Sequence, residues 1–332
     1  MKKITVIGFG SWGIALACLL AKNGHSVAAW EFNPDMAEKL DAEREHKAFL
    51  PGITIPQSIR ITSDVAKAAE GTEIFLLTLP SHAIESAMQK FAPYFTADSI
   101  LVSASKGFIQ GRDVRICEFL AEFAPNCKVA CLTGPSHAEE VSRNMPTTVV
   151  AASSCEKTAE IVQNTFSDRS FRVYTTSDII GAELGGAIKN VIALAAGIVD
   201  GLGFGDNTKA ALMTRGIAET ARLGVAMGAD EQTFAGLSGI GDLIVTCTSK
   251  HSRNWRAGNL LASGAAVEDV LKEVNMVVEG VHTAKTAREL ARKYKVDMPI
   301  VEEINKALFE GKNPKDAVVD LMLRDKKDEY QN

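Results

Sequence analysis

The first half of the chain alternates short apolar, β-branched runs with stretches of helical periodicity. Runs typical of buried strands occur at 3–7, 26–30, 59–62, 73–79, 99–103, 128–132, 147–151 and 171–174. Helical patterns lie between most of them. One covers 11–23 and is stopped by Gly24, and a second starts at Pro34. Ser63-Asp64 can cap one further helix and Ser81 another, because their side-chain oxygens can accept first-turn N–H groups. Strands that alternate with helices predict a mainly parallel sheet covered on both faces.

The pattern changes after about Ser177. The stretch 179–198 is long, apolar and rich in small residues, as in a buried helix, and helical patterns follow at 206–228, 253–263, 266–274, 282–294, 299–310 and 314–323. We found no strand pattern in this half. The prediction is therefore an α/β fold, with a doubly wound sheet domain over 1–178 followed by an all-α domain over 179–332. The ending 324–332 is expected to be a solvated tail.

Composition and charge narrow the class of protein. With 332 residues the chain has room for about two domains of ordinary size. Hydrophobic residues at 46% and charged residues at 23% are typical of a soluble globular protein. The 36 basic and 41 acidic residues give a net charge of −5, which argues against nucleic-acid binding, because that function needs a basic surface.

The cysteines and apolar runs bear on location. The six cysteines form no CxxC pair, so we expect scattered buried thiols in a reducing compartment and a cytoplasmic protein. Met1-Lys2-Lys3 and the apolar run after them superficially resemble a secretory signal. Gly8, Gly10 and Gly13 interrupt that run at a spacing that matches a known binding motif, described next, so no signal peptide is predicted. The run 191–199 is shorter than the roughly 20 residues of a membrane span, and we predict none.

The interrupting glycines form a dinucleotide-binding fingerprint. Gly8, Gly10 and Gly13 fit G-x-G-x-x-G directly after a strand and at the start of a helix. Gly8 would permit a tight turn, Gly10 would let the backbone approach a diphosphate, and Gly13 would let the helix pack close to the sheet. The N–H groups at the start of that helix would bind the diphosphate. The first domain is therefore predicted to be of the Rossmann type.

Glu31 ends the second predicted strand, eighteen residues after Gly13. At this position an acidic side chain accepts hydrogen bonds from the adenosine ribose of NAD and repels the 2′-phosphate of NADP. No Arg or Lys follows in 32–34 to bind such a phosphate. The alternative is a solvent-facing Glu at the end of a strand.

Lys189 and Asn190 interrupt the long apolar helix of the second domain. An ammonium group without a partner is costly in apolar surroundings. A desolvated lysine can serve as an acid or a base. The alternative is a lysine whose charged end reaches the surface.

Three polar segments are further candidates. Ser103–Gly107 and Thr133–Ala138 each follow a predicted strand, where the carboxyl ends of parallel strands face a ligand crevice, although each could be an ordinary turn. In the segment 239–254, Ser252, Arg253 and Asn254 could begin a helix and bind a phosphate, or the segment could be a charged interhelical loop. No HxxxH or HxH pair occurs, so we predict no metal site.

Taken together, these segments resemble the NAD(P)-dependent glycerol-3-phosphate dehydrogenases of the bacterial cytoplasmic type along nearly the whole chain. The matching segments are 8–17, 49–56, 105–108, 133–141, 181–198, 239–258 and 277–284. Glu31-Phe32-Asn33 departs from the family, in which many bacterial members carry basic residues there. We therefore expect NAD(H) as the cofactor, with NADP(H) as the alternative.

The resemblance implies reversible hydride transfer between the nicotinamide and C2 of sn-glycerol 3-phosphate or dihydroxyacetone phosphate, in a homodimer that supplies phospholipid synthesis. It makes Lys189 the proton acceptor for alcohol oxidation and the donor for ketone reduction. On the substrate side it places Lys106, Gly134, Ser136, Lys189, Asp242, Ser252, Arg253 and Asn254. On the cofactor side it places Ser11, Trp12, Phe32, Asn33, Lys106, Ala138, Arg253, Val277 and Glu279.

Two other functions fit the same motifs. A related dehydrogenase could act on another small hydroxy acid, and its site would not need to bind a phosphate. Alternatively, the chain could be an NAD-sensing protein without turnover.

Overall fold

The computed structural model describes residues 1–326 and 328–329, so the predicted tail 324–332 lies partly outside the described residues. The chain forms two compact units. The sheet unit comprises Met1–Ile109 and Val114–Ile179, and the helical unit comprises Gln110–Asp113 and Ile180–Asn332. Each is described by itself.

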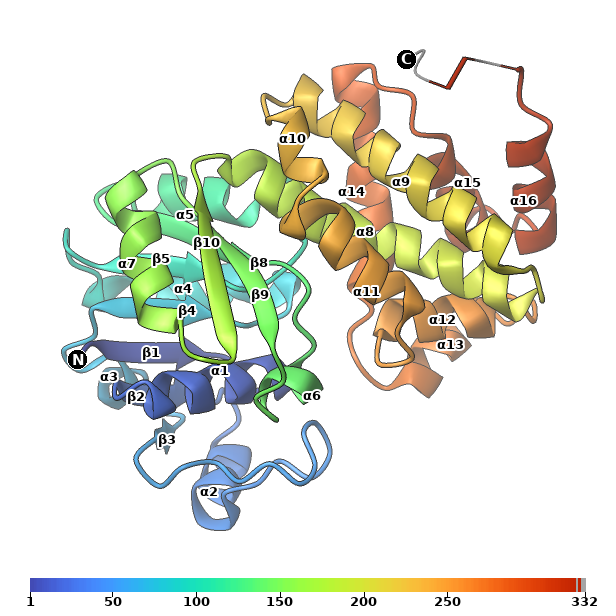
Figure 1. The fold of residues 1–332 in the computed structure, drawn as a ribbon. Helices are drawn as coiled ribbons and strands as arrows, with labels where there is room; N and C mark the ends of the chain where they lie inside the picture. The colour runs from blue at the N-terminus through green and yellow to red at the C-terminus, as the bar shows by residue number, and fades with distance from the viewer. Residues whose placement is uncertain (327, 330–332) are drawn as a thin grey trace. The chain divides into compact units, whose positions relative to one another are not determined.

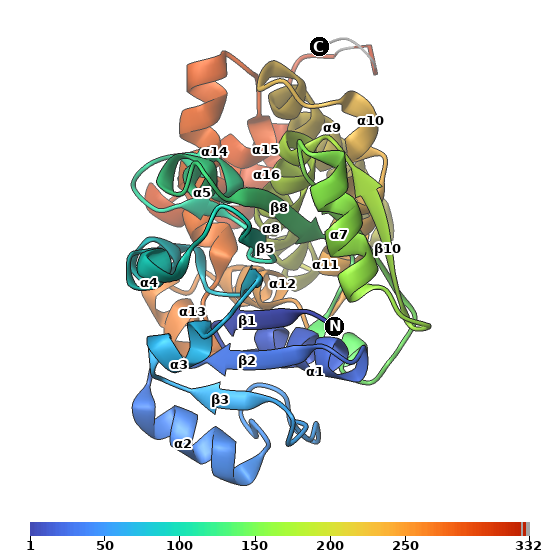
Figure 2. The ribbon, with the colours of Figure 1, turned by 90° about the vertical axis from the view of Figure 1, so that its left-hand side faces the viewer.

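An eight-stranded sheet forms the centre of the first unit (Figure 1). In chain order its strands are β1 (Lys3–Ile7), β2 (Ser26–Trp30), β3 (Arg60–Thr62), β4 (Ile74–Leu77), β5 (Ile100–Ser103), β8 (Lys128–Thr133), β9 (Thr147–Ala152) and β10 (Phe171–Thr176). Their spatial order is β10-β9-β8-β5-β4-β1-β2-β3, and Figure 2 shows β1, β2 and β3 lying in this order. Every neighbouring pair is parallel except β8 and β9. The prediction of a mainly parallel sheet is confirmed.

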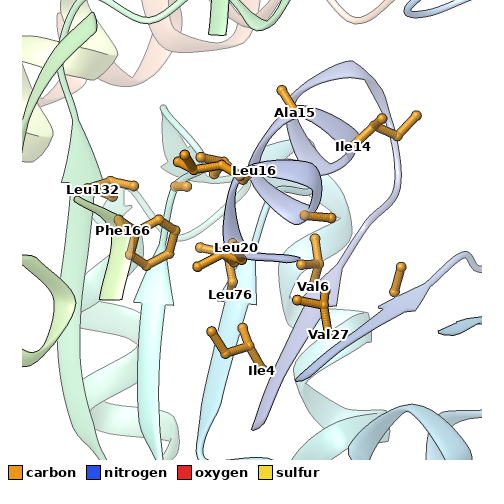
Figure 3. Packing of buried hydrophobic residues seen from close by; sticks show 14 of the residues in the cluster. Ile4, Val6, Ile14, Ala15, Leu16, Leu20, Val27, Leu76, Leu132 and Phe166 are labelled. Atoms are coloured by element: carbon orange, nitrogen blue, oxygen red, sulfur yellow. The ribbon is translucent and has the colours of Figure 1, made fainter. Parts of the chain in front are cut away.

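The strands are apolar throughout because helices cover both faces. One face carries α1 (Ser11–Lys22), α2 (Pro34–Glu43), α6 (Ala138–Val141) and α7 (Glu156–Phe166). Figure 3 shows Leu16 and Leu20 of α1 near Val6 and Leu76, and Phe166 of α7 near Leu132. The other face carries α3 (Val65–Ala69), α4 (Ile84–Phe91) and α5 (Ile116–Phe123), with the 3₁₀ turns η1 (Ser81–Ala83) and η2 (Ala92–Tyr94) beside α4. This is a doubly wound sheet.

Two of the predicted helix boundaries are confirmed and one is wrong. Gly24, just after α1, has φ +80°, which is the left-handed conformation expected of it. Asp64 accepts hydrogen bonds from the N–H groups of Ala66 and Lys67 and so caps α3. Ser81, in contrast, caps no helix, because it is itself the first residue of η1 and α4 begins three residues later.

A hairpin that the pattern did not predict lies between β5 and α5. Its strands are β6 (Phe108–Ile109) and β7 (Val114–Arg115), which pair in antiparallel fashion. The tip of the hairpin, residues 110–113, is the segment that belongs to the helical unit.

In the helical unit, α8 is the central helix. In chain order the elements are α8 (Ile179–Gly201), α9 (Asp206–Ala226), α10 (Glu231–Phe234), the π-helical turn η3 (Leu237–Gly241), α11 (Asp242–Thr248), α12 (Arg253–Leu261), α13 (Val267–Val274), α14 (Glu279–Tyr294), α15 (Pro299–Phe309) and α16 (Pro314–Met322). By length and composition α8 could cross a membrane, but 83% of its apolar window is buried inside the protein, as in a core helix. The described part of this unit contains no strand, as predicted.

The cysteines meet the expectation of buried thiols only in part. All six are free; Cys117, Cys131 and Cys247 are buried, whereas Cys18 and Cys127 are partly exposed. Cys155 is exposed, because it lies at the N-cap of α7 and not on that helix's apolar face. The prediction of buried thiols is therefore wrong for Cys155.

Glu219 is a buried carboxylate that caps another helix. Its side chain, 2% exposed, accepts hydrogen bonds from Ile300 N (2.9 and 3.1 Å) and Val301 N (3.4 Å) in the first turn of α15. Burial raises the pKa of Glu219 to about 7, although those N–H groups and Arg222 act in the opposite direction. The helix gains a cap, but the carboxylate loses its hydration.

We therefore expect stability to depend on pH through Glu219. Its pKa is higher in the folded protein than the ordinary value of 4.5 for a free Glu side chain, so the folded state holds the proton more tightly. The free energy of unfolding should fall as pH rises from about 4.5 to about 7, by on the order of 3 kcal/mol, and then level off. Urea unfolding of the wild type and of Glu219→Gln from pH 4.5 to 8 measures the contribution. A difference between the two that does not change with pH would contradict it.

Candidate active site

The glycine loop adopts the geometry that a dinucleotide needs. Gly8 has φ +96°, a conformation that favours glycine, and its N–H donates to Trp30 O at 3.1 Å. A Cβ on Gly13 would lie 2.1 Å from Gly8 O, so only glycine lets α1 approach the loop this closely. Both roles predicted for these glycines are confirmed by the geometry.

The start of α1 is suited to binding an anion. Gly10 is the N-cap and offers no side-chain cap, so the N–H groups of the first turn, beginning at Ser11, keep their capacity to donate. A Cβ on Gly10 would meet no atom within 4 Å, so the space beside the loop is open. Trp12 Nε1 donates to Ala104 O at 3.1 Å and ties this turn to the loop after β5. These features fit a diphosphate at the helix N-terminus.

Glu31 lies at the end of β2 but is only 8% exposed, so the alternative of a solvent-facing side chain is wrong. Burial raises the pKa of Glu31, and the N–H of Asn33, which donates to Glu31 Oε1 at 3.1 Å, offsets part of that rise. Asn33 in turn caps α2, since its Oδ1 accepts from Met36 N. Phe32 lies between them and is 70% exposed. The exposed ring beside a buried carboxylate is compatible with an adenosine site.

The loops after β5 and β8 are joined by a lysine. Lys106 Nζ donates to Gly134 O at 3.1 Å, and Ser136 Oγ donates to the same carbonyl at 2.8 Å. Gly134 has φ +134°. Ala138 begins α6 just beyond, with His137 as its N-cap. The two predicted segments therefore meet at the carboxyl end of the sheet.

In the helical unit, Lys189 forms an ion pair with Asp242. The two residues are 7% and 1% exposed, so the lysine does not reach the surface and that alternative is wrong. Lys189 Nζ also donates to Thr246 Oγ1 at 2.8 Å, and Thr246 Oγ1 donates to Asp242 O at 2.6 Å. The charge of the ammonium group is compensated by a carboxylate, and its direction is set by two partners on α11.

Nearby, burial raises the pKa of Cys247 to about 12, so its thiol stays neutral.

The segment 242–248 was expected to be part of a polar loop or phosphate-binding stretch, and it is instead the helix α11, with Asp242 on its buried side. Thr246 was not singled out from the sequence. A hydroxyl four residues after the acidic partner, on the same helix face, is the signal that could have identified it.

Ser252, Arg253 and Asn254 begin α12, as predicted. Ser252 is the N-cap, and its Oγ accepts from Trp255 N at 3.2 Å. Arg253, partly exposed, is the first helical residue. Asn254 Nδ2 donates to Asn190 Oδ1 at 3.0 Å, and Asn254 Oδ1 accepts from Gly280 N at 2.8 Å. These bonds link the residue next to Lys189 with the start of α14.

The last two predicted residues, Val277 and Glu279, lie at that same start. Glu279 is the first residue of α14, and Val277 precedes it. The predicted positions thus fall into two groups, one at the carboxyl end of the sheet and one around Lys189 in the helical unit.

Two other features of the described residues bear on function. A cavity of about 410 Å³ lies among α14, α15 and α16, but no predicted site residue lines it. No group of three or more His, Cys, Asp or Glu side chains within the described ranges could hold a metal ion.

Known protein families match both halves of the chain. A family described as the NAD-dependent glycerol-3-phosphate dehydrogenase N-terminus matches residues 3–159, and the one described as the C-terminus of the same enzyme matches residues 178–319.

Individual proteins are similar over the full length. One from Desulfitobacterium hafniense, named glycerol-3-phosphate dehydrogenase (NAD(P)+), is 52% identical over 331 residues, covering 100% of this chain and 94% of that protein. One of the same name from Agathobacter rectalis is 50% identical and covers 100% of this chain and 99% of that protein. The crystal structure of glycerol-3-phosphate dehydrogenase from Coxiella burnetii superposes with a TM-score of 0.94 at 34% identity, covering 97% of this chain and 99% of that one.

Proposed function

The chain belongs to the NAD-dependent glycerol-3-phosphate dehydrogenase family, and from this premise we propose which of its residues carry out the reaction. It is an oxidoreductase that transfers a hydride reversibly between NAD(P)H and dihydroxyacetone phosphate, forming sn-glycerol 3-phosphate. The observation that carries the assignment of roles is the buried Lys189–Asp242 pair, oriented by Thr246.

Lys189 is proposed to move the proton. When bound, the cofactor gives or accepts the hydride at the nicotinamide C4. During ketone reduction the Lys189 ammonium donates a proton to the oxygen on C2, and during alcohol oxidation the neutral amine accepts it. Asp242 compensates the positive charge, and Thr246 restricts the direction of the ammonium group. A group held in one direction transfers a proton more effectively than a mobile one.

The start of α12 is proposed to bind the substrate phosphate. A guanidinium group binds a phosphate through charge-assisted and often paired hydrogen bonds, and Arg253 lies where the helix N-terminus adds N–H donors. Ser252 Oγ is engaged as the cap and Asn254 is bonded to Asn190 and Gly280, so both would hold the shape of this site as well as contact the substrate. On the sheet unit, Lys106, Gly134 and Ser136 are the other proposed substrate contacts.

The other roles are proposed for the cofactor side. Gly8, Gly10, Ser11, Trp12 and Gly13 would hold the diphosphate, and Glu31, Phe32 and Asn33 the adenosine. The remaining proposed contacts are Lys106, Ala138, Arg253, Val277 and Glu279.

One experiment separates this function from its alternatives. Loss of NADH absorbance is followed with dihydroxyacetone phosphate and with unphosphorylated dihydroxyacetone. The proposed site predicts turnover of dihydroxyacetone phosphate and little turnover of unphosphorylated dihydroxyacetone. Equal turnover of the two compounds would contradict the phosphate-binding role. NADH binding without turnover would indicate a sensing protein.

The sheet unit also predicts a preference for NADH over NADPH. Glu31 can accept hydrogen bonds from the ribose hydroxyls, whereas a 2′-phosphate beside its carboxylate costs on the order of a few kcal/mol at an effective dielectric near 20. We expect kcat/KM to favour NADH by roughly tenfold or more, where tenfold is about 1.4 kcal/mol. The double variant Glu31→Gln with Phe32→Arg should narrow or reverse the preference for NADH, because it removes the carboxylate charge and adds a guanidinium that can bind the 2′-phosphate. Gln is chosen because it keeps an acceptor for Asn33 N–H.

Glu38→Ala is the matched control, since it removes an exposed acidic side chain from the adjoining α2. It should leave the ratio of kcat/KM values unchanged at one ionic strength. A wild type that uses both cofactors equally, or prefers NADPH, would show that Glu31 does not select the cofactor.

Assembly and location are also proposals. A homodimer is supported by the exposed apolar side chains Val319, Met322 and Leu323 at the end of α16, and sedimentation tests it. A cytoplasmic location is supported by six free cysteines, and fractionation of cells tests it. The role that fits the reaction is the supply of glycerol 3-phosphate for phospholipid synthesis.

A further inference from the structure

The carbonyl group of Gly8 lies beside the end of β4, the strand next to β1. Thr78, the residue after β4, donates from its Oγ1 to Gly8 O at 2.6 Å. The same hydroxyl is 3.2 Å from Ile7 O, but that oxygen already accepts from Thr78 N at 3.0 Å. Among the described residues no other donor is bonded to Gly8 O. The side chain of Thr78 therefore holds the first carbonyl of the glycine loop.

The two sides of the glycine loop differ in the space they offer. A Cβ on Gly13 would lie 2.1 Å from Gly8 O and 2.9 Å from Thr78 Oγ1, so the carbonyl points into a closed space between β4 and α1. A Cβ on Gly10, in contrast, would meet no atom within 4 Å. The Gly8 oxygen thus lies on the closed side of the loop, away from the open space beside Gly10.

The direction of this carbonyl matters for an anion. A helix N-terminus binds a diphosphate through its N–H groups, whereas a carbonyl oxygen carries a partial negative charge that repels it. Rotation of the peptide after Gly8 is little hindered, because Gly8 has no Cβ. Without an anchor, this peptide is free to turn its oxygen toward the open side of the loop.

We propose that Thr78 is a positioning residue for the dinucleotide: its hydroxyl keeps the Gly8 carbonyl turned away from the side of the glycine loop that binds the cofactor diphosphate. The inference rests on the proposed role of the glycine loop. Thr78 acts through Gly8 and not by contact with the cofactor. A chain that lacks the hydroxyl has to order this peptide when the cofactor binds, and its affinity falls accordingly.

Thr78→Val tests the proposal, because valine keeps the shape and removes the donor. The Kd for NADH, measured by fluorescence on the folded protein, should rise roughly two- to tenfold, the range that corresponds to one hydrogen bond. The KM for NADH should rise with it, whereas kcat at saturating NADH should stay near the wild-type value, because only binding is weakened. Thr78→Ser keeps the hydroxyl and should restore the Kd.

Thr5→Val is the matched control. Thr5, on β1, is fully buried, and its Oγ1 donates to another backbone carbonyl, Ala68 O, also at 2.6 Å. The loss of this bond should lower the melting temperature but leave the Kd for NADH unchanged, because Ala68 is not part of the glycine loop. An unchanged Kd in Thr78→Val, an equal rise in Thr5→Val, or a failure of Thr78→Ser to restore the Kd would each overturn the proposal.

A double-mutant cycle with Gly13→Ala tests whether Thr78 acts through the Gly8 carbonyl. The added Cβ must displace that carbonyl, because it would otherwise lie 2.1 Å away. Thr78→Val should therefore cause no further rise of the Kd in the Gly13→Ala background, and the full rise in both backgrounds would overturn the proposal.

The same cycle recognises a failure of the underlying function separately. If folded Gly13→Ala binds NADH as tightly as the wild type does, the proposed role of the glycine loop is wrong, and the role of Thr78 falls with it. If Gly13→Ala does not fold, the comparison of Thr78→Val with Thr78→Ser and Thr5→Val decides by itself.

Discussion

Replacing Lys189 with alanine should abolish turnover while NADH still binds. Lys189 is the one proposed proton donor on α8, and a positioned acid–base group contributes roughly 10²- to 10⁴-fold to the rate. The glycine loop that would bind the diphosphate lies in the sheet unit and does not include α8. Steady-state kcat with dihydroxyacetone phosphate and an NADH titration by fluorescence measure the two effects separately.

The substitution also leaves Asp242 buried without its ion-pair partner, which costs about 3–5 kcal/mol. Circular dichroism must therefore show that Lys189→Ala is folded, and the double variant Lys189→Met with Asp242→Asn removes both charges if it is not. Lys209→Ala is a matched control, because Lys209 pairs with Asp200 at 2.7 Å in the same unit and has no proposed catalytic role. Activity of folded Lys189→Ala within a few-fold of the wild type would refute the proton-transfer role.

Replacing Arg253 with alanine should weaken binding of the phosphorylated substrate far more than binding of NADH. A guanidinium–phosphate pair is charge-assisted, so its loss should cost roughly 2–5 kcal/mol of substrate binding, by analogy with truncated buried charge pairs. Arg253 is also expected near the cofactor, so a small effect on NADH fits the proposal. Calorimetric Kd values for glycerol 3-phosphate and for NADH give the two losses directly.

Arg256→Ala provides the matched comparison for Arg253. It removes the same charge from the same helix, but Arg256 is exposed and lies beyond the first turn of α12. It should change both Kd values little, because exposed charges are screened by water and salt. Equal losses for the two ligands in Arg253→Ala would mean that Arg253 does not bind the phosphate.

The elements that the sequence missed are short or lack an apolar pattern. Each strand of the β6–β7 hairpin has two residues, too few for any periodicity to appear. The π-helical turn η3 contains Gly239 and Gly241, and α11 follows it directly, in a segment where no helix was predicted before Ser252. Helix formation there depends on packing: a Cβ on Gly239 would lie 2.2 Å from Phe234 O, so this turn is in close contact with α10.

The sequence by itself determined the parallel sheet, the helical second half and the glycine loop. Each depends on local information: apolar runs, helical periodicity, and the turn and close approach that Gly8 and Gly13 permit. Only the tertiary structure decided how Lys189 is held, because its partner Asp242 is 53 residues away and its burial depends on the packing of α8 against α11. Likewise, the hydrogen bond from Thr78 to the Gly8 carbonyl joins residues 70 positions apart. Such pairs leave no periodicity in the chain, since they are brought together by burial of the whole core and not by local preference.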